Sequence, residues 1–283
     1  DSTFLTSTII DGDQRGPVVT FDSGESTATL LCGFTIQHGY GNYYIDEKDC
    51  GGGIIIYNAS PHIKSNIIEN NYAPDRGAGI YKRKGRGEDI PTLIESNIIR
   101  TNNTGTSGYG GGIYINLAST VLYQNEITGN SANRGGGIYI IQANPELIDN
   151  KINANITTDD GAGIYMSRSN AIFINVEMTD NSGDYALYIY CSDPHIVKSS
   201  IYANPAGGVE LKCGEDELDH QLSSSYDHFI SYPVFNSSYI YSNTGAELTT
   251  YTSSTYGDNS FEMEYTNIEG DCSSLSDFSN ETC

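Results

Sequence analysis

The feature that most constrains the fold is a short motif that recurs along the chain every 22–33 residues. A small residue and a glycine are followed by an aliphatic residue and then, in most copies, by tyrosine. Self-similarity at such a period indicates a solenoid, in which each repeat is one structural unit. The copies are Gly52-Gly53-Ile54-Ile55, Ala78-Gly79-Ile80-Tyr81, Gly111-Gly112-Ile113-Tyr114, Gly136-Gly137-Ile138-Tyr139 and Ala162-Gly163-Ile164-Tyr165, followed by the weaker Tyr185-Ala186-Leu187-Tyr188 and Gly207-Gly208-Val209-Glu210.

A second motif, Asn-x-Ile-x-x-Asn, follows each copy of the first and keeps phase with it over most of the chain. Asparagine tolerates the left-handed backbone of a tight corner, and stacked amides can hydrogen-bond from one repeat to the next. The last asparagine of each motif therefore predicts a structural ladder at one corner, in preference to a functional role. Its members are Asn71, Asn102, Asn130, Asn155, Asn181, Asn204 and Asn243.

Each repeat contains two or three short alternating strands and no segment with the periodicity of an amphipathic helix. This combination predicts an all-β protein, a right-handed parallel β-helix of about seven or eight coils. The coils are expected over residues 1–213, with a loop excursion over 214–232. A last coil and a disulfide-stapled C-terminal cap are expected over 233–283. The N-terminus shows no evident cap, so exposed coil ends would allow head-to-tail stacking of subunits.

The charge of the chain restricts its partners. It carries 14 Lys and Arg against 36 Asp and Glu, a formal net charge of −22. This balance argues against nucleic acid, because there is too little basic surface to neutralise phosphates. No run approaches the roughly 20 apolar residues that would span a bilayer, so membrane insertion is not expected. The first residues do not read as a signal peptide, and we expect that any targeting segment has been removed.

The six cysteines indicate an oxidising, extracellular compartment. Cys191 and Cys213 each lie four residues after equivalent repeat positions, Leu187 and Val209. They should therefore stack on adjacent coils, within disulfide range. Elimination and nearness in sequence then predict the pairs Cys32–Cys50 and Cys272–Cys283, although sequence cannot establish pairing.

Asn-x-Ser/Thr sequons occur at five asparagines. Asn102 and Asn155 belong to the predicted ladder and should be buried without glycan. The glycosylation candidates are Asn58, Asn236 and Asn280.

Three stretches near the N-terminus carry a resemblance, namely Thr8-Ile9-Ile10-Asp11-Gly12-Asp13, Val18–Glu25 and Leu31–Gln37. Together with the Gly-Gly-Gly-Ile-Tyr copies and Tyr265–Gly270, they resemble secreted bacterial right-handed parallel β-helix repeat proteins of the surface or adhesin-like passenger type. The resemblance covers about residues 8–270 and implies the fold and a secreted or cell-surface location. Such proteins include uncharacterised surface proteins, adhesin-like passengers and, more distantly, polysaccharide lyases and hydrolases.

The tyrosines of the first motif are candidate binding residues. They follow an inward aliphatic residue, so they should point outward and form a row along one face. An aromatic strip with polar tips could bind sugar rings or a protein partner, although tyrosine also suits a strand without any such role. The row contains Tyr81, Tyr114, Tyr139, Tyr165 and Tyr188.

A basic loop offers candidate catalytic residues. Lys82, Lys84 and Arg86 lie in the longest repeat, and Lys82 occupies a position that other repeats fill with an inward Ile or Met. An inward lysine would have a lowered pKa and could serve as a base for β-elimination of an acidic polysaccharide. The favoured interpretation is instead that the strand ends early and the loop is a solvated insertion.

Acidic side chains give two further kinds of candidate. Carboxylate pairs, Asp159 with Asp160 or Asp180 with Asp184, could supply the acid and base of a glycoside hydrolase. Two acidic clusters could bind Ca²⁺, although neither has the spacing of a known calcium loop, and solvated loops are the simpler interpretation. The clusters are Asp46, Glu47 and Asp49, and Glu215, Asp216, Glu217 and Asp219.

These observations favour a non-enzymatic extracellular or cell-surface protein that acts in adhesion, glycan binding or structural assembly. A polysaccharide or surface glycan is the expected partner, with a homo-oligomer or head-to-tail filament as a further possibility. The alternative is a polysaccharide lyase or glycoside hydrolase acting on an acidic polysaccharide. No cofactor is implied apart from the calcium considered above.

Overall fold

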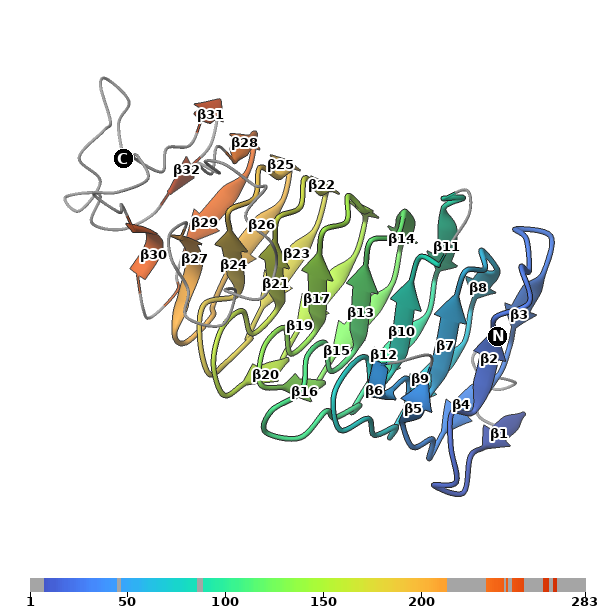
Figure 1. Cartoon of the computed structure of the whole chain (residues 1–283). Helices are drawn as coiled ribbons and strands as arrows, with labels where there is room; N and C mark the ends of the chain where they lie inside the picture. Colours follow the sequence, from blue (N-terminus) through green and yellow to red (C-terminus); the bar gives the residue numbers. More distant parts are fainter. Residues whose placement is uncertain are drawn as a thin grey trace, which may run out of the picture.

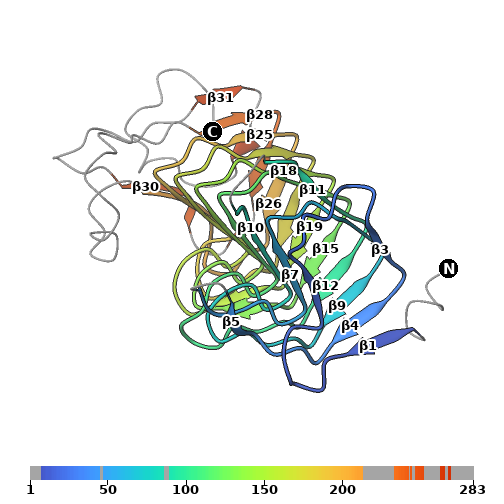
Figure 2. The same cartoon turned by 45° about the vertical axis from the view of Figure 1, so that its right-hand side comes forward.

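The computed structural model describes residues 8–44, 47–85, 89–212, 233–241, 243, 246–251, 262–264 and 267–268. In this part of the chain the strands form three long parallel sheets (Figures 1 and 2). Each sheet receives one strand from every turn of the chain, so the strands of one turn pair with those of the next. The predicted parallel β-helix is confirmed.

The three sheets contain ten, nine and nine strands, which is more turns than the seven or eight that the sequence motifs indicate. The additional turns come from both ends of the chain, where the motifs are absent or weak. Sheet A contains β1 (Ile9–Asp11), β4 (Thr35–Gln37), β9 (Ile67–Glu69), β12 (Ile98–Arg100), β15 (Glu126–Thr128), β19 (Lys151–Asn153), β23 (Glu177–Thr179), β26 (Ser200–Tyr202), β29 (Tyr239–Tyr241) and β32 (Asn267–Ile268). Sheet B contains β2 (Val19–Phe21), β7 (Ile54–Tyr57), β10 (Ile80–Arg83), β13 (Ile113–Asn116), β17 (Ile138–Ile141), β21 (Ile164–Ser167), β24 (Leu187–Tyr190), β27 (Gly207–Lys212) and β30 (Ala246–Tyr251). Sheet C contains β3 (Leu30–Cys32), β8 (His62–Lys64), β11 (Thr92–Glu95), β14 (Thr120–Tyr123), β18 (Glu146–Ile148), β22 (Ile172–Ile174), β25 (His195–Val197), β28 (Val234–Asn236) and β31 (Glu262–Glu264).

Two small sheets accompany the three long ones. Strands β16 (Ser131–Ala132) and β20 (Ile156–Thr157) pair in parallel, and β5 (Asn42–Tyr44) pairs with β6 (Glu47–Cys50) in antiparallel fashion. Both lie in the connections that lead from sheet A to sheet B. At the other end of the chain, β30, β31 and β32 extend all three sheets beyond residue 243.

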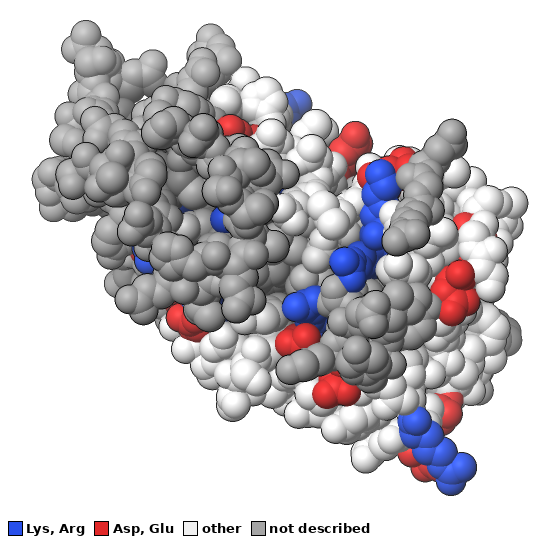
Figure 3. Space-filling model, viewed as in Figure 1, with Lys and Arg blue, Asp and Glu red and all other residues white. Residues whose placement is uncertain are grey.

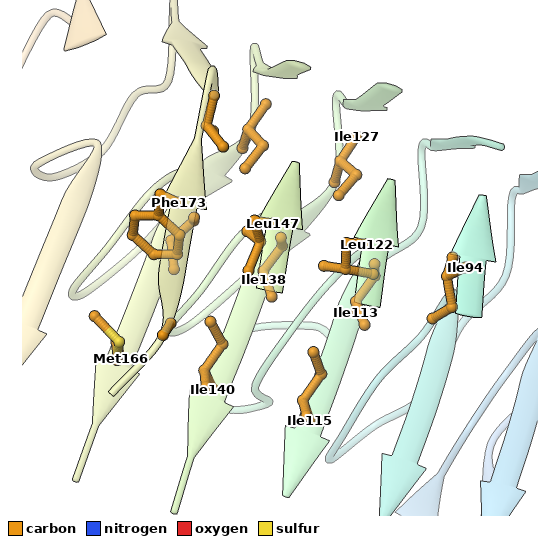
Figure 4. Close-up of a cluster of buried hydrophobic side chains, with 14 of the residues drawn as sticks. Ile94, Ile113, Ile115, Leu122, Ile127, Ile138, Ile140, Leu147, Met166 and Phe173 are labelled. Atoms are coloured by element: carbon orange, nitrogen blue, oxygen red, sulfur yellow. The ribbon is translucent and has the colours of Figure 1, made fainter. Parts of the chain in front are cut away.

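The core is a set of aliphatic columns that run along the axis between the sheets. In β17, Ile138 and Ile140 point inward and are fully buried, while Tyr139 lies on the outer face, as the period of two predicts. The same inward positions are filled by Ile113 and Ile115 on the preceding turn (Figure 4). Complete burial of one such side chain stabilises the fold by about 1.5–3 kcal/mol before entropy is considered.

The predicted asparagine ladder is present and buried. The Nδ2 atom of Asn130 donates to Oδ1 of Asn155 at 3.1 Å, and Asn155 repeats this contact with Asn181. The left-handed backbone, however, belongs to the residue before each ladder asparagine from Asn71 to Asn204, as in Ala154 with φ 54°. A second ladder, which the sequence analysis did not single out, joins sheets C and A and contains Asn66, Asn97, Asn125 and Asn150.

The predicted Cys32–Cys50 disulfide is wrong, because both residues carry thiols. Cys32 ends β3 in sheet C, whereas Cys50 ends β6 and pairs with Arg76 in the connection that leads to sheet B. Nearness in sequence therefore did not bring these side chains together. Cys191 is disulfide-bonded, and Leu187 and Val209 are in register as predicted. Cys213, Cys272 and Cys283 lie outside the described residues, so the pairings that involve them stay predictions.

Candidate functional site

The motif tyrosines form one continuous stack on the outer face of sheet B. Their ring centroids are 4.7–5.5 Å apart along the row, and successive rings are within 3–9° of parallel. The stacking follows from the register, because Tyr114, Tyr139 and Tyr165 are direct partners on adjacent strands. Side chains at the same position of neighbouring parallel strands lie one strand spacing apart, which suits flat rings.

These tyrosines are buried, which corrects the expectation of an exposed aromatic strip. The side chains from Tyr81 to Tyr188 are 0–8 % exposed, because they pack on one another and against residues of the preceding connections such as Tyr109. Two of the rings have a guanidinium above them, with Arg76 over Tyr114 and Arg134 over Tyr165, each 5.6 Å from the centroid. The row is therefore a second, outer core, and contact of these rings with a ligand stays a prediction.

Lys82 points into the hydrophobic core and not toward the surface. It is 2 % exposed, lies in register with Ile56 and Ile115, and donates from Nζ to the backbone oxygen of Ala59 at 2.6 Å. Burial lowers the pKa of Lys82 to about 8. The favoured interpretation, in which the strand ends early at Lys82, is wrong, because β10 continues to Arg83. The inward orientation and lowered pKa of the catalytic alternative are present, but the amine lies among the aliphatic side chains of the core. Lys84 is half-buried just after β10, and Arg86 lies outside the described residues.

Three carboxylates converge where the tyrosine row ends. Glu210 on β27 is the register partner of Tyr188 and takes the next place in the row. Asp160 and Asp184 lie in the connections that precede β21 and β24. One carboxylate oxygen from each of the three residues lies within 4.8 Å of the other two. Three successive turns of the chain therefore contribute to one acidic cluster, which we define as Asp160, Asp184 and Glu210.

The acidic cluster is partly removed from water. Burial raises the pKa of Glu210 to about 7 and that of Asp160 to about 6, and the neighbouring carboxylates contribute to both shifts. Burial also raises the pKa of Asp184, although the backbone amide of Gly161 donates to its Oδ2 at 3.2 Å. Perturbed carboxyl groups that share a small volume are typical of functional sites.

Two cationic side chains border the acidic cluster. Nε of Arg134 lies 2.9 Å from Oδ2 of Asp159 and 3.1 Å from Oδ2 of Asp160. Lys212 is two residues beyond Glu210 on the same strand and lowers the pKa of both Glu210 and Asp160. Figure 3 likewise shows Lys and Arg side chains lying among Asp and Glu side chains on the face that it displays.

The sequence analysis named two of the three residues, as members of two separate carboxylate pairs. It paired Asp160 with Asp159 and Asp184 with Asp180, whereas the structure brings Asp160 and Asp184 together and adds Glu210. A signal for Glu210 was available, because it stands in the motif where five other repeats have tyrosine. A carboxylate in an otherwise aromatic column is a departure from the repeat that the sequence displays directly.

The acidic residues that were predicted as calcium ligands lie elsewhere. Asp49 precedes Cys50 at the end of β6 and has a left-handed backbone with φ 42°. Glu47 belongs to the same strand, but its side chain is not described, and Asp46 lies outside the described residues. The same is true of Glu215, Asp216, Glu217 and Asp219. Metal binding by these two clusters stays a prediction.

The glycosylation candidates differ in exposure. Asn58 is exposed just after β7, and Asn236 is half-buried at the end of β28. Asn280 lies outside the described residues. Asn102 and Asn155 are fully buried in the ladder, as expected.

A family comparison agrees with the arrangement of three parallel sheets around an aliphatic core. The family model described as "Right handed beta helix region" matches residues 87–261, more than half of the chain. The chain belongs to the right-handed β-helix family. No curated protein and no solved structure matches this β-helix. Among the residues that the structure describes, no helix is long and apolar enough to span a bilayer.

Proposed function

We propose that this β-helix is a non-enzymatic extracellular or cell-surface protein that acts in adhesion, glycan binding or structural assembly. The observation that carries the proposal is that the recurring polar and aromatic side chains hold the coils together. Ladder asparagines such as Asn130 are buried and hydrogen-bonded to their equivalents on the next turn. Tyrosines such as Tyr139 are buried and stack on theirs. Such a chain is a stiff support that can present its long outer faces to a partner.

The ends of the sheets support assembly of several copies. Within the described residues, β1, β2 and β3 pair on one side only, and so do β32, β30 and β31 at the other end. Strands with an unpaired side are templates for further pairing. Since the strands within each long sheet run in the same direction, one copy would stack on the next head to tail, and such a contact generates filaments.

The disulfide at Cys191 and the net charge of −22 support a location outside the cell. A polysaccharide or surface glycan is the partner that we propose for the outer faces. The test is negative-stain microscopy over a range of protein concentrations, together with retention of the protein on immobilised polysaccharides. Filaments that lengthen with concentration, or retention on a glycan, would support the proposal. Single particles that bind no glycan would contradict it.

The alternative is cleavage of an acidic polysaccharide. The raised pKa values of Asp160 and Glu210 favour it, because a general acid must stay protonated near neutral pH. The assay is a polysaccharide panel, read by ultraviolet absorbance for unsaturated lyase products and by reducing ends for hydrolysis. Cleavage that is lost in Glu210→Gln but kept in Glu126→Gln, which alters an exposed carboxylate on sheet A, would replace the non-enzymatic proposal.

A further inference from the structure

Glu210 stands out in the acidic cluster because its side chain is mostly buried and, among the described residues, is bonded to no cation. The residue is 9 % exposed, and within the described part of the chain it forms no hydrogen bond or ion pair. Its oxygen is directed toward Asp160 and Asp184, within 4.8 Å of both. Burying an ionised carboxylate without compensation costs several kcal/mol, so a group of this kind is either kept neutral, as its raised pKa reflects, or held ionised by a positive partner.

Among the described residues, the negative charges of the acidic cluster exceed the positive charges that border it. Four carboxylates, those of Asp159, Asp160, Asp184 and Glu210, face the two cations Arg134 and Lys212. The guanidinium of Arg134 is already engaged by Asp159 and Asp160. When all four carboxyl groups are ionised, the site therefore has an excess of two negative charges, which one divalent cation would neutralise.

We propose that Asp160, Asp184 and Glu210 together bind one divalent cation, and that Ca²⁺ is the ion that fits best. The three oxygens lie within 4.8 Å of one another, so a point at their centre is about 2.8 Å or less from each oxygen. This distance is close to the 2.3–2.6 Å of Ca²⁺–oxygen bonds. Small side-chain movements close the difference, and water supplies the remaining ligands. Mg²⁺ needs bonds of about 2.0–2.1 Å in a strict octahedron, which would require a larger contraction.

Cation binding would also connect successive turns of the β-helix. Asp160 precedes β21, Asp184 precedes β24, and Glu210 belongs to β27, so one ion would join three neighbouring turns of sheet B. It would do so where the tyrosine stack ends and Glu210 interrupts it. The expected consequence is a Ca²⁺-dependent gain in thermal stability. This inference goes beyond the proposed scaffold role and stands whether or not the protein binds a glycan.

The experiment titrates the metal-free whole chain with Ca²⁺ in a calorimeter and follows the luminescence of added Tb³⁺. Tb³⁺ prefers the same oxygen ligands and is excited through nearby tyrosines, here Tyr188 beside Glu210. We expect a dissociation constant of about 0.1–1 mM, as in extracellular calcium modules. Glu210→Gln should weaken Ca²⁺ binding at least tenfold and remove the Tb³⁺ signal, whereas Glu126→Gln should change neither.

Melting curves separate loss of the site from loss of the fold. Without Ca²⁺, Glu210→Gln should melt at or above the temperature of the unaltered protein, since it removes an uncompensated buried charge. It should then gain nothing from added Ca²⁺, while the unaltered protein and Glu126→Gln melt higher. Equal Ca²⁺ affinity in the unaltered protein and Glu210→Gln, or no binding at millimolar Ca²⁺, would overturn the proposal.

Discussion

The amine of Lys82 donates to the backbone oxygen of Ala59 at a distance of 2.6 Å inside the aliphatic core. Lys82 occupies a column that Ile56 and Ile115 fill on the adjacent turns, and it is 2 % exposed. A single hydrogen bond does not replace the hydration of an ammonium group. Lys82 therefore interrupts an aliphatic column of the core, and its burial lowers the stability of the folded protein.

Replacement of Lys82 with methionine should stabilise the protein at neutral pH. Burial lowers the pKa from the ordinary 10.5 to about 8, so at pH 7 the folded protein carries a buried charge that costs about 3 kcal/mol. As pH rises from 8 to 10.5 the unfolded chain binds more protons than the folded one, and the stability of the unaltered protein should increase. Urea unfolding at pH 7 and pH 10 measures both effects.

The control for Lys82→Met is Lys151→Met, which alters an exposed lysine on sheet A. It should change the free energy of unfolding by less than about 0.5 kcal/mol at both pH values. If Lys82→Met is destabilising at pH 7 and the rise in stability between pH 8 and 10.5 persists in the variant, the assigned pKa of Lys82 is wrong.

The ladder asparagine Asn130 should tolerate substitution poorly. Its Nδ2 donates to Ile99 O at 2.9 Å and to Asn155 Oδ1, while its Oδ1 accepts from the backbone and side chain of Asn102. Asn130→Ala leaves several fully buried groups without partners, at a cost of about 3 kcal/mol or more. Asn133→Ala removes one surface contact with Thr158 and should cost less than about 1 kcal/mol. Chemical unfolding of the two variants checks the difference, and equal costs would contradict a structural role for the ladder.

Sequence reasoning reached the fold because the repeats reflect backbone geometry. Strand β17, which begins at Ile138, places an aliphatic residue inward, its partners on the adjacent turns do the same, and the register makes the asparagines coincide. It placed coils from the first residue onward, but it could not locate the individual strands of the first turns, β1 to β6, because the recurring motifs begin only at Gly52.

The acidic cluster could not be assembled from sequence for a different reason. Asp160 and Asp184 lie in connections of different length and conformation, so their spacing along the chain does not reveal which oxygens meet. The burial of the tyrosine row has the same origin. The sequence indicates that Tyr139 leaves the core, but it does not show that side chains of the preceding connections, such as Tyr109, pack against its ring.

Two glycines with the same backbone angle should respond differently to alanine. Gly135 and Gly129 have φ of 64° and 62°. A Cβ atom on Gly135 would lie 2.6 Å from the backbone oxygen of Ile138, whereas one on Gly129 would meet nothing nearer than 4.0 Å. The equivalent of Gly129 on the next turn is already alanine, Ala154, with φ 54°. Gly129→Ala should therefore cost about 1 kcal/mol, the strain of the left-handed region alone. Gly135→Ala should cost several times more, and similar melting temperatures for the two variants would refute the steric account.

The two cysteine thiols at the N-terminal end should differ sharply in reactivity. Cys32 is exposed, whereas Cys50 is fully buried beside Tyr81, and burial raises the pKa of the Cys50 thiol. Since the thiolate is the reacting form, iodoacetamide should modify native Cys32 at least about a hundredfold faster than Cys50. Peptide mass spectrometry after timed labelling measures each rate separately, and Cys32→Ser identifies the signal of the exposed thiol. In denaturant the two cysteines should react at similar rates. Protection of both thiols that disappears on reduction would show instead that they form a disulfide, and the placement of Cys50 away from Cys32 would have to be abandoned.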